Sequence, residues 1–203
     1  MADKMKNYNI IFIVGDGLRT NNIGCYGYDK NTTPFIDKLS KEGIFFKNAF
    51  SCTNHTDPSF TTMMSGRYPI THGILRHDFR AHRYTEEEMK IVDRTGTVFI
   101  QEILKKEGYK TISFDWLGRW HKRGFDFYGE TGPWFSLPEK FENFLEILPF
   151  RIGNKIKRVL HKIGITLPGR SGVFYTKEAI KFIKKNRKNN FFMLLHNWDT
   201  HTP

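Results

Sequence analysis

Apolar runs alternate with amphipathic stretches along this 203-residue chain. Residues 9–14 form a short, β-branched run that ends in Gly15 and Asp16, a pattern typical of a buried parallel strand. Further strands are predicted over residues 44–50, 109–114 and 191–195, and helices over 33–42, 56–65, 97–106 and 172–186. Because strands and helices alternate, the pattern predicts an α/β fold with a mostly parallel sheet flanked by helices.

The alternation breaks between residues 115 and 171. This stretch contains Trp116, Trp120 and Trp134 together with several prolines, which indicates loops and an inserted, partly helical excursion. Within residues 141–163 apolar and basic positions are mixed, so this part either packs on the domain or lies on a membrane surface. We therefore expect a single domain over residues 1–203, with a basic insertion around 130–171.

The net charge is concentrated in one segment. Residues 151–190 carry 12 Lys and Arg and one acidic residue, a surplus equal to the formal net charge of +11 of the whole chain. Such a cluster either meets an anionic polymer or membrane or is a solvated face. No helix-turn-helix, zinc-finger or RNP-like signature accompanies it, so we predict no nucleic-acid partner. Peripheral membrane contact through residues 151–190 remains an alternative.

The cysteines and the N-terminal segment bear on the compartment. Cys25 and Cys52 are the only cysteines, too few for a disulfide framework or a cysteine zinc site. The apolar core before Asp16 spans about six residues, which is too short for a membrane-spanning helix or an ordinary signal peptide. The prediction is a cytoplasmic protein.

Residues able to do chemistry follow the predicted strands. Asp16 follows the first strand, Thr56 begins the helix after the second, and His196, Asp199 and His201 follow the last. The carboxyl ends of parallel strands form one ligand-binding edge, so we expect these residues to converge. Each also has a structural interpretation: Asp16 as a turn residue, Asp199 as a helix cap, His201 as a surface histidine and Thr56 as an N-cap.

The start of the predicted helix at Thr56 suits an anion. Asp57 and Pro58 fit a first helical turn, and the apolar run that follows stops at Gly66. Free backbone N–H groups and the positive end of the helix dipole favour a sulfate or phosphate group at such a position. The Thr56 hydroxyl would then lie beside that group, where a nucleophile is needed.

Four segments resemble the sulfatase family of the alkaline-phosphatase-like superfamily, in matching order. They are residues 10–50, 56–73, 108–129 and 191–203. The first is similar to the family's opening strand, with an Asp metal ligand followed by Leu-Arg. Residues 56–60 stand where the family carries Cys or Ser, any residue, Pro, Ser, Arg. Residues 118–121 resemble its Gly-Lys-Trp-His, and residues 199–203 its Asp-Pro-His-x-Pro.

The resemblance implies a sulfatase fold and a role for each matched residue. A divalent ion, either calcium or magnesium or alternatively zinc or manganese, would be held by Asp16 and Thr56 and would polarise the ester. Arg119 and His121 would neutralise the non-bridging oxygens, and His201 would contact the ester oxygen or assist the leaving group. Thr56 would be the nucleophile of an in-line displacement and form a covalent ester, released by water or an acceptor hydroxyl.

Two departures from the family pattern bear on the reaction. Thr56 cannot yield the formylglycine aldehyde that sulfatases make from Cys or Ser, and the motif's arginine is replaced by Phe60. Threonine is the nucleophile in related phosphodiesterases and phosphoryl transferases. The resemblance therefore implies a metal-dependent hydrolase or transferase acting on sulfate or phosphate esters of small molecules, glycans or lipids. A non-catalytic relative that binds an anion or a partner is the alternative.

Some expected metal ligands have no counterpart. The family's paired aspartates appear here as Asp16 and Gly17, and its later Asp followed by Asn or His is not found up to residue 203. The resemblance thus implies the N-terminal part of a single sulfatase-like catalytic domain, with a fold incomplete at the C-terminus and half of a metal site. We expect this chain alone to be inactive or nearly so.

Overall fold

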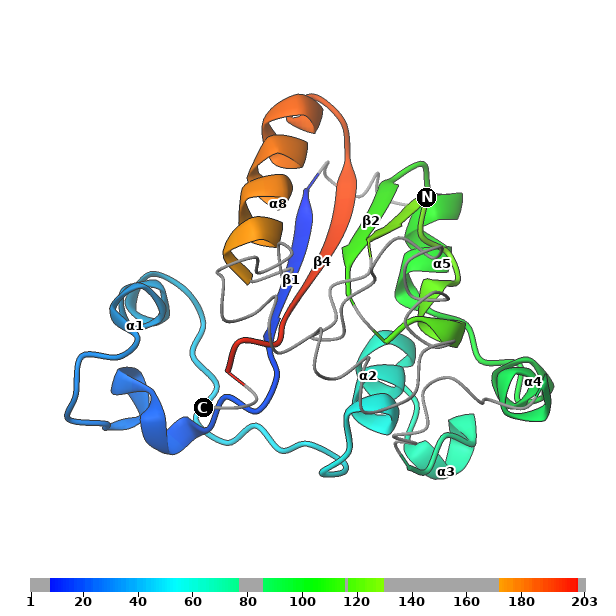
Figure 1. The fold of residues 1–203 in the computed structure, drawn as a ribbon, viewed down its shortest axis with the longest axis horizontal. Helices are drawn as coiled ribbons and strands as arrows, with labels where there is room; N and C mark the ends of the chain where they lie inside the picture. The colour runs from blue at the N-terminus through cyan, green and yellow to red at the C-terminus, as the bar shows by residue number, and fades with distance from the viewer. Residues whose placement is uncertain (1–7, 77–85, 116, 130–171, 201–203) are drawn as a thin grey trace, which may run out of the picture.

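The computed structural model describes residues 8–76, 86–115, 117–129 and 172–200. Its centre is a four-stranded sheet in the order β1-β4-β2-β3, in which every neighbouring pair is parallel. The strands are β1 (Ile10–Gly15), β2 (Lys110–Phe114), β3 (Phe127–Gly129) and β4 (Phe191–Asn197). The predicted α/β fold with a mostly parallel sheet is confirmed (Figure 1).

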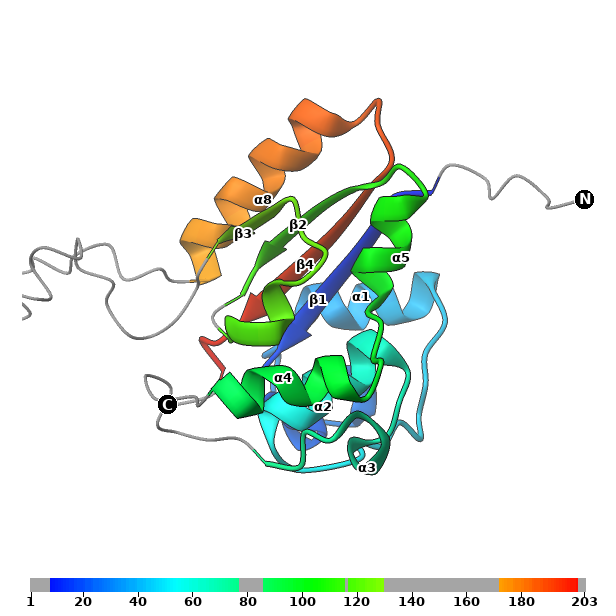
Figure 2. The same ribbon diagram turned by 90° about the vertical axis from the view of Figure 1, so that its right-hand side faces the viewer.

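One face of the sheet is covered by α8 (Gly172–Asn186). Met193 and Leu195 of β4 pack there with Tyr175 and Ala179 of the helix, and all four side chains are buried. Figure 2 shows α8 running along the sheet on the side opposite α5. The bounds predicted for this helix are confirmed.

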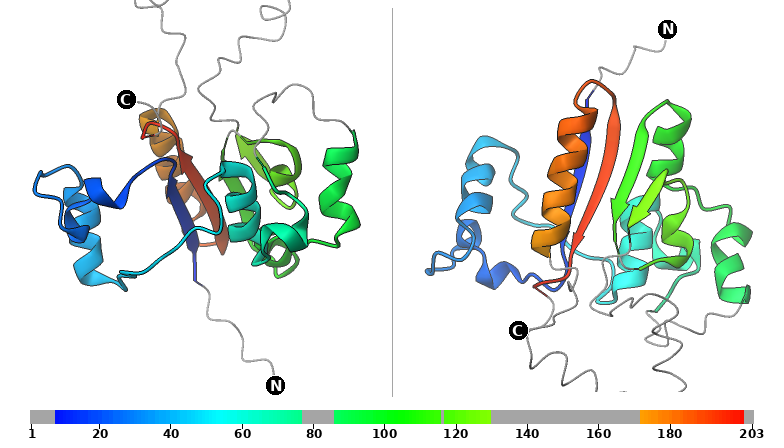
Figure 3. Two further views of the ribbon diagram at one scale, coloured as in Figure 1. Left: turned by 90° about the horizontal axis from the view of Figure 1, so that it is seen from below. Right: turned by 45° about the horizontal axis from the view of Figure 1, so that its top comes forward.

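The other face packs against α2 (Thr56–Ser65) and α5 (Ile100–Lys106). Phe192 and Leu194 alternate along β4 with the residues that face α8, and they join a second buried cluster with Trp120. Because consecutive side chains of a strand point to opposite faces, an apolar strand such as β4 fills two cores. Figure 3 shows α8 and α2 on opposite sides of β1 and β4.

Three further helices complete the described part of the fold. They are α1 (Pro34–Glu42), α3 (Pro69–His72) and α4 (Glu86–Arg94), with 3-10 helices at Thr20–Asn22, Gly24–Tyr26 and Arg119–Lys122. In Figure 1, α1 stands apart from the strands. Its Asp37 carboxylate accepts the Cys25 N–H at 2.7 Å and so ties the helix to the segment after β1. Gly24 permits this approach, because a Cβ there would overlap the Asp37 carboxylate.

Residues 44–50 do not form the predicted strand, so that prediction is wrong. The run is apolar, yet the side chains of Ile44, Phe46 and Phe50 are 85%, 68% and 90% exposed. A strand needs a neighbour that accepts its backbone hydrogen bonds. β1 instead pairs with β4, which follows it by about 180 residues in the chain.

Other boundaries also differ from the prediction. The helix predicted over residues 97–106 begins at Ile100, because the Glu102 carboxylate accepts the Phe99 N–H at 2.9 Å and caps the helix there. The sequence prediction lacks α3, α4 and β3. Of the excursion predicted over residues 115–171, the structure describes 117–129, and the basic insertion around 130–171 lies outside the described residues. Within the described residues, no helix is long and apolar enough to cross a membrane.

Candidate active site

Thr56 is the first residue of α2, and His55 is the N-cap. The helix ends at Gly66, whose φ of 67° is the left-handed conformation that glycine adopts readily. The prediction that Thr56 lies at or beside the N-cap is confirmed. The Thr56 side chain is half-buried, and its Oγ1 lies 3.5 Å from Oδ2 of Asp16. The predicted nucleophile and the predicted metal ligand are therefore neighbours.

Asp16 lies at the carboxyl end of β1, as predicted. The β1–β4 register pairs Val14 with His196 and Gly15 with Asn197, so the two strands end at the same level. The Asp16 N–H donates to the Asn197 carbonyl oxygen at 2.9 Å, which continues the pairing by one residue. This pairing fixes the backbone on which the Asp16 carboxylate stands.

A cavity of about 710 Å³ opens at this edge of the sheet. It is lined by the end of β1, the segment before α2 and the first turns of α2, including Asp16, Asn54, Thr56 and Phe60. The Asp16 side chain is 15% exposed. The cavity therefore gives a ligand access to a carboxylate and a hydroxyl that lie side by side.

A buried histidine and carboxylate lie behind Asp16. His196 Nδ1 is 2.6 Å from Asp115 Oδ1, and His196 Nε2 is 3.4 Å from Asp16 Oδ2. The hydroxyl of Tyr128 also donates to Asp115, and so does the Leu117 N–H at 3.3 Å. Because an ionised carboxylate only accepts hydrogen bonds, Asp115 places the proton of His196 on Nδ1. The sequence prediction names His196 but omits Asp115, whose position directly after β2 was the available signal.

His196 and Asp115 each favour the charged form of the other. Burial lowers the pKa of His196, but its hydrogen bonds to Asp115 and Asp16 and their negative charges outweigh burial and raise that pKa above its usual value. Burial likewise raises the pKa of Asp115, yet the hydrogen bond and charge of His196 dominate and hold that pKa below its usual range. Asp115 is therefore an ionised carboxylate inside the protein.

Arg119 and His121 reach the first turn of α2. Arg119 Nη2 donates to Oδ1 of Asp57, and His121 Nε2 lies 3.6 Å from the same oxygen. Asp57 is fully buried, and the Arg119 side chain is 10% exposed. The structure thus places Arg119 and His121 beside the helix that carries Thr56, as the prediction requires. Their partner in the structure is the Asp57 carboxylate. Their contact with substrate oxygens stays a prediction.

His72 is a buried histidine that the sequence prediction omits. Its Nδ1 accepts the Ile74 N–H at 3.1 Å, so the ring proton lies on Nε2, which is 3.0 Å from the Thr62 hydroxyl. Burial lowers the pKa of His72, a backbone hydrogen bond to Pro58 partly offsets this, and the charge of His121 lowers the pKa further. His72 joins α2 to the end of α3 as a neutral ring.

The free energy of unfolding is expected to depend on pH through His72. The unfolded state, with a pKa of about 6.5, takes up the proton before the folded state does, so stability is complete above that pH and falls as pH decreases. Urea unfolding at about pH 7.5 and about pH 5.5 measures this for the wild type and for His72→Gln. The variant loses about 1–3 kcal/mol at the higher pH and shows a smaller decrease between the two. An equal decrease in both proteins would contradict the assignment.

The segment after β4 ties the sheet to α8. Both carboxylate oxygens of Asp199 accept the N–H of Gly172, the first residue of α8, at 3.1 and 2.9 Å. The Thr200 hydroxyl donates to the backbone carbonyl of Asp16 at 2.7 Å. The contacts of Asp199 agree with the helix-capping interpretation. His201 lies outside the described residues, so its role near the leaving group stays a prediction.

Comparison with known proteins decides the family. The family model described as Sulfatase matches residues 8–203. The chain belongs to the sulfatase family. N-acetylgalactosamine-6-sulfatase from Homo sapiens is 28% identical over 216 residues, which cover 96% of this chain and 40% of the relative. N-acetylgalactosamine-6-O-sulfatase from Bacteroides thetaiotaomicron is 34% identical over 130 residues, which cover 62% of this chain and 24% of the relative.

Solved structures support the same sulfatase fold. Ps i-CgsB has a TM-score of 0.65 and 23% identity, with 98% of this chain and 46% of that chain covered. The phosphonate monoester hydrolase of Agrobacterium radiobacter has a TM-score of 0.62 and 16% identity, with 96% and 41% covered. At these identities the likeness concerns the fold. This sulfatase-family chain spans about 40% of the length of the first curated relatives.

Sulfatase-family members generally use a divalent metal, and the donor atoms at this edge fit one in part. Asp16 Oδ2 and Thr56 Oγ1 are oxygen donors 3.5 Å apart at the wall of the cavity, a hard donor type that suits calcium or magnesium. In the part of the chain that the structure describes, no group of three or more His, Cys, Asp or Glu side chains is arranged to hold a metal. Gly17 supplies no side-chain donor.

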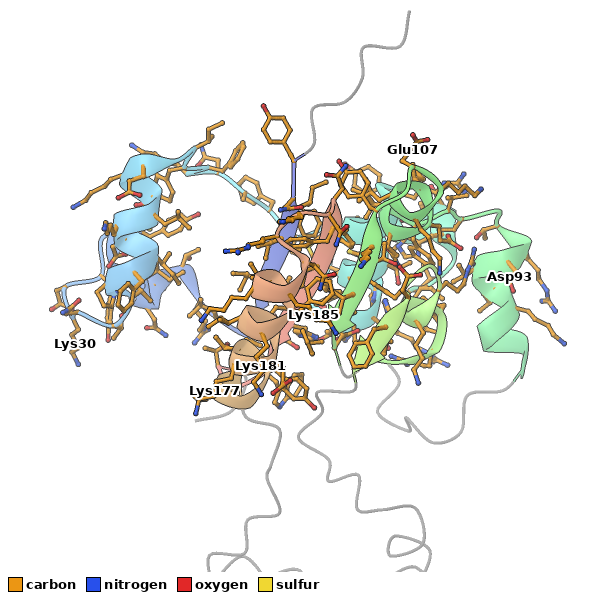
Figure 4. The ribbon with its side chains drawn as sticks, turned by 90° about the horizontal axis from the view of Figure 1, so that it is seen from above. Lys30, Asp93, Glu107, Lys177, Lys181 and Lys185 are labelled. Atoms are coloured by element: carbon orange, nitrogen blue, oxygen red, sulfur yellow. The ribbon has the colours of Figure 1, made fainter. Side chains whose placement is uncertain are left out.

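The basic segment of this sulfatase-family chain is described only from residue 172 onward. Lys177, Lys181 and Lys185 are exposed along α8 (Figure 4), and Lys181 Nζ lies 2.6 Å from the Glu178 carboxylate. These positions recur every four residues and so share one side of the helix. Peripheral membrane contact through residues 151–190 stays a prediction, and the lysines of α8 agree equally with a solvated face.

Proposed function

We propose that this sulfatase-family chain supplies the nucleophile and part of the metal site of an enzyme that cleaves sulfate or phosphate esters. The observation that carries the proposal is the Thr56 hydroxyl at the first residue of α2, 3.5 Å from the Asp16 carboxylate and at the wall of the cavity. A helix start favours an anionic group, and the carboxylate favours a cation. The helix start would attract the anionic ester, and the cation held by the carboxylate would offset its negative charge beside the Thr56 hydroxyl.

The reaction is an in-line displacement at sulfur or phosphorus. The Thr56 oxygen forms a bond to that atom as its hydroxyl loses a proton, and the bond to the ester oxygen breaks. The departing oxygen takes up a proton and leaves as the alcohol. Water then attacks the covalent Thr56 ester, releases inorganic sulfate or phosphate and restores the hydroxyl. Arg119 and His121 are proposed to stabilise the negative oxygens, and His201 to assist the leaving group.

Asp16 and Thr56 would hold the divalent cation. When bound, the cation supplies Lewis-acid polarisation of the ester and stabilises the ionised threonine oxygen. The protein fixes the Asp16 backbone through the hydrogen bond to Asn197 and through the Thr200 hydroxyl, so the backbone that carries this donor is oriented before any ion binds. This orientation is the contribution of the chain itself.

The substrate class follows from the relatives and from Thr56. Two curated relatives are named N-acetylgalactosamine-6-sulfatases, and Ps i-CgsB was solved in complex with k-i-k-neocarrahexaose, which favours a sulfated sugar. Threonine cannot form the formylglycine aldehyde, which favours a phosphoryl or phosphonyl group instead. Both arguments agree on an anionic ester of a sugar or similar alcohol as the substrate. The experiment below distinguishes whether the transferred group is sulfuryl or phosphoryl.

Trapping the covalent intermediate tests the proposal. The purified product of the whole gene is incubated with nitrophenyl sulfate or nitrophenyl phosphate carrying a radiolabel in the transferred group, quenched in acid and digested. The label is expected on the peptide that contains Thr56, from one of the two esters. Turnover without label on that peptide would refute the Thr56 nucleophile, and label from only one ester identifies the substrate group.

The 203-residue chain by itself is expected to release nitrophenol slowly or not at all. Calcium takes about six to eight oxygen ligands, and Asp16 and Thr56 supply two oxygens 3.5 Å apart at this edge. A non-catalytic relative that binds an anion or partner is the second candidate. The contacts of Arg119 and His121 with Asp57 favour it, because both side chains already face a protein carboxylate. A labelled Thr56 peptide would exclude this candidate.

A further inference from the structure

Three lysines form a row along the exposed side of α8. Lys177, Lys181 and Lys185 are exposed, and Figure 4 shows them following the axis of the helix. Because an α-helix rises about 1.5 Å per residue, neighbouring lysines of this row are about 6 Å apart along the axis. We propose that the lysine row binds an anionic polysaccharide, so that the ester cleaved at Thr56 is one group of a longer charged chain. The inference deepens the proposed function and rests on it.

The lysine row starts near the edge of the sheet that carries the candidate site. The N–H of Gly172, the first residue of α8, donates to the Asp199 carboxylate just after β4. From that edge the helix runs back along the sheet, so Lys177 lies about 8 Å and Lys185 about 20 Å from Gly172 along its axis. A small ester in the cavity beside Thr56 is too short to contact the whole row, whereas a polymer chain is long enough.

The signs of the charges distinguish the lysine row from an ordinary solvated face, with which exposure alone also agrees. On α1 the exposed Lys38 faces Glu42 four residues later, with 3.8 Å between the charged atoms. On α8 the same spacing joins lysine to lysine, and the single acidic residue of the helix, Glu178, pairs with Lys181. Like charges four residues apart destabilise a helix. An anionic chain along the row would supply a countercharge to all three lysines.

The packing of α8 favours a polymer over a membrane. Tyr175 and Ala179 are buried against β4, so the apolar side of the helix that would enter a membrane is already covered. Among the described side chains of α8, the exposed large apolar ones are Val173 and Ile180. The outward side of the helix therefore offers mainly electrostatic contact. Because the proposed substrate is an anionic ester of a sugar, the polymer that suits both the row and the site is an anionic polysaccharide.

Polymer binding without turnover tests this inference. The product of the whole gene, carrying Thr56→Ala, is titrated with fluorescent dextran sulfate, and fluorescence anisotropy gives the Kd at several salt concentrations. Replacing the three lysines of the row with glutamine, which favours a helix almost as well, is expected to weaken binding by about 10-fold and to make it less sensitive to salt. The matched control replaces the exposed Lys30, Lys38 and Lys41, in and before α1, with glutamine and is expected to change the Kd by less than about 2-fold.

Inhibition shows whether the bound polymer reaches the candidate site. Dextran sulfate is expected to compete with the nitrophenyl ester that labels the Thr56 peptide. The triple variant of the lysine row should raise the inhibition constant by about 10-fold, with kcat and KM for the small ester unchanged. Equal loss of binding in the row and control variants, tighter binding to phosphatidylserine vesicles or duplex DNA than to dextran sulfate, or inhibition that is not competitive would each overturn the inference. Failure of Thr56 to form an adduct would refute the proposed nucleophile and leave the anisotropy results as they are.

Discussion

Replacing Thr56 with alanine is expected to lower turnover by the whole gene product by at least about 1,000-fold, because the oxygen that forms the covalent ester is removed. The change lies at the first residue of α2, where Pro58 and the cap geometry of His55 remain in place. Folding should therefore be preserved, and circular dichroism with thermal unfolding checks this. The measurement is kcat for the nitrophenyl ester that labels the Thr56 peptide.

Two variants sharpen the Thr56 result. Thr56→Ser keeps the hydroxyl and is expected to retain far more activity than the alanine variant. Thr176→Ala makes the same chemical change on the exposed side of α8 and should leave kcat unchanged. Activity of Thr56→Ala comparable to that of Thr56→Ser would mean that the hydroxyl is a cap and that the nucleophile is elsewhere.

Replacing Asp57 with alanine is expected to destabilise the fold by about 3–5 kcal/mol. Asp57 is fully buried and is the carboxylate partner of Arg119, with His121 3.6 Å away. The variant leaves the Arg119 guanidinium, which is 10% exposed, without this countercharge in a site that water hardly enters. Chemical unfolding of the 203-residue chain, followed by tryptophan fluorescence, measures the loss.

The matched control is another Asp–Arg pair in the same chain. Asp93 Oδ1 lies 2.9 Å from Arg123 Nη1, but the Asp93 side chain is 66% exposed. Asp93→Ala should therefore cost no more than about 1 kcal/mol. Combining Asp57→Leu with Arg119→Met removes both charges and is expected to recover part of the loss. If Asp57→Ala were no more harmful than Asp93→Ala, the buried pair would not stabilise the fold.

The periodic parts of the fold could be predicted from the sequence. β1 and α8 have local patterns that agree with their packing: a β-branched run before Gly15, and an amphipathic helix whose apolar side meets β4. Residues 44–50 have an equally apolar pattern, but within the part of the chain that the structure describes they pair with no strand, so the apolar pattern alone led to a wrong prediction. The helix α3 has four residues, too few to show the helical repeat of apolar positions in the sequence. Its form depends instead on Pro69 and on packing.

The candidate site was predicted where strand ends and motifs coincide, and missed where side chains meet only in space. Asp16 and Thr56 follow predicted elements, and the structure places them 3.5 Å apart. The contact of Asp115 with His196 joins residues 81 positions apart, and no local spacing indicates it. Likewise, the motif suggests that the Arg119 guanidinium is available to a substrate anion. In the structure it is paired with the buried Asp57 carboxylate, which no local spacing indicates.

The order of the strands has a consequence for synthesis on the ribosome. β1 emerges first, yet its partner β4 is the last described strand, and their register joins Ile10 to Phe192. Until residues 191–197 have left the ribosome, β1 lacks the neighbour that satisfies its backbone, and the carboxylate of Asp16 has no fixed place. The nascent chain therefore carries β1 without this partner while about 180 further residues are synthesised, a state in which chaperones would bind it.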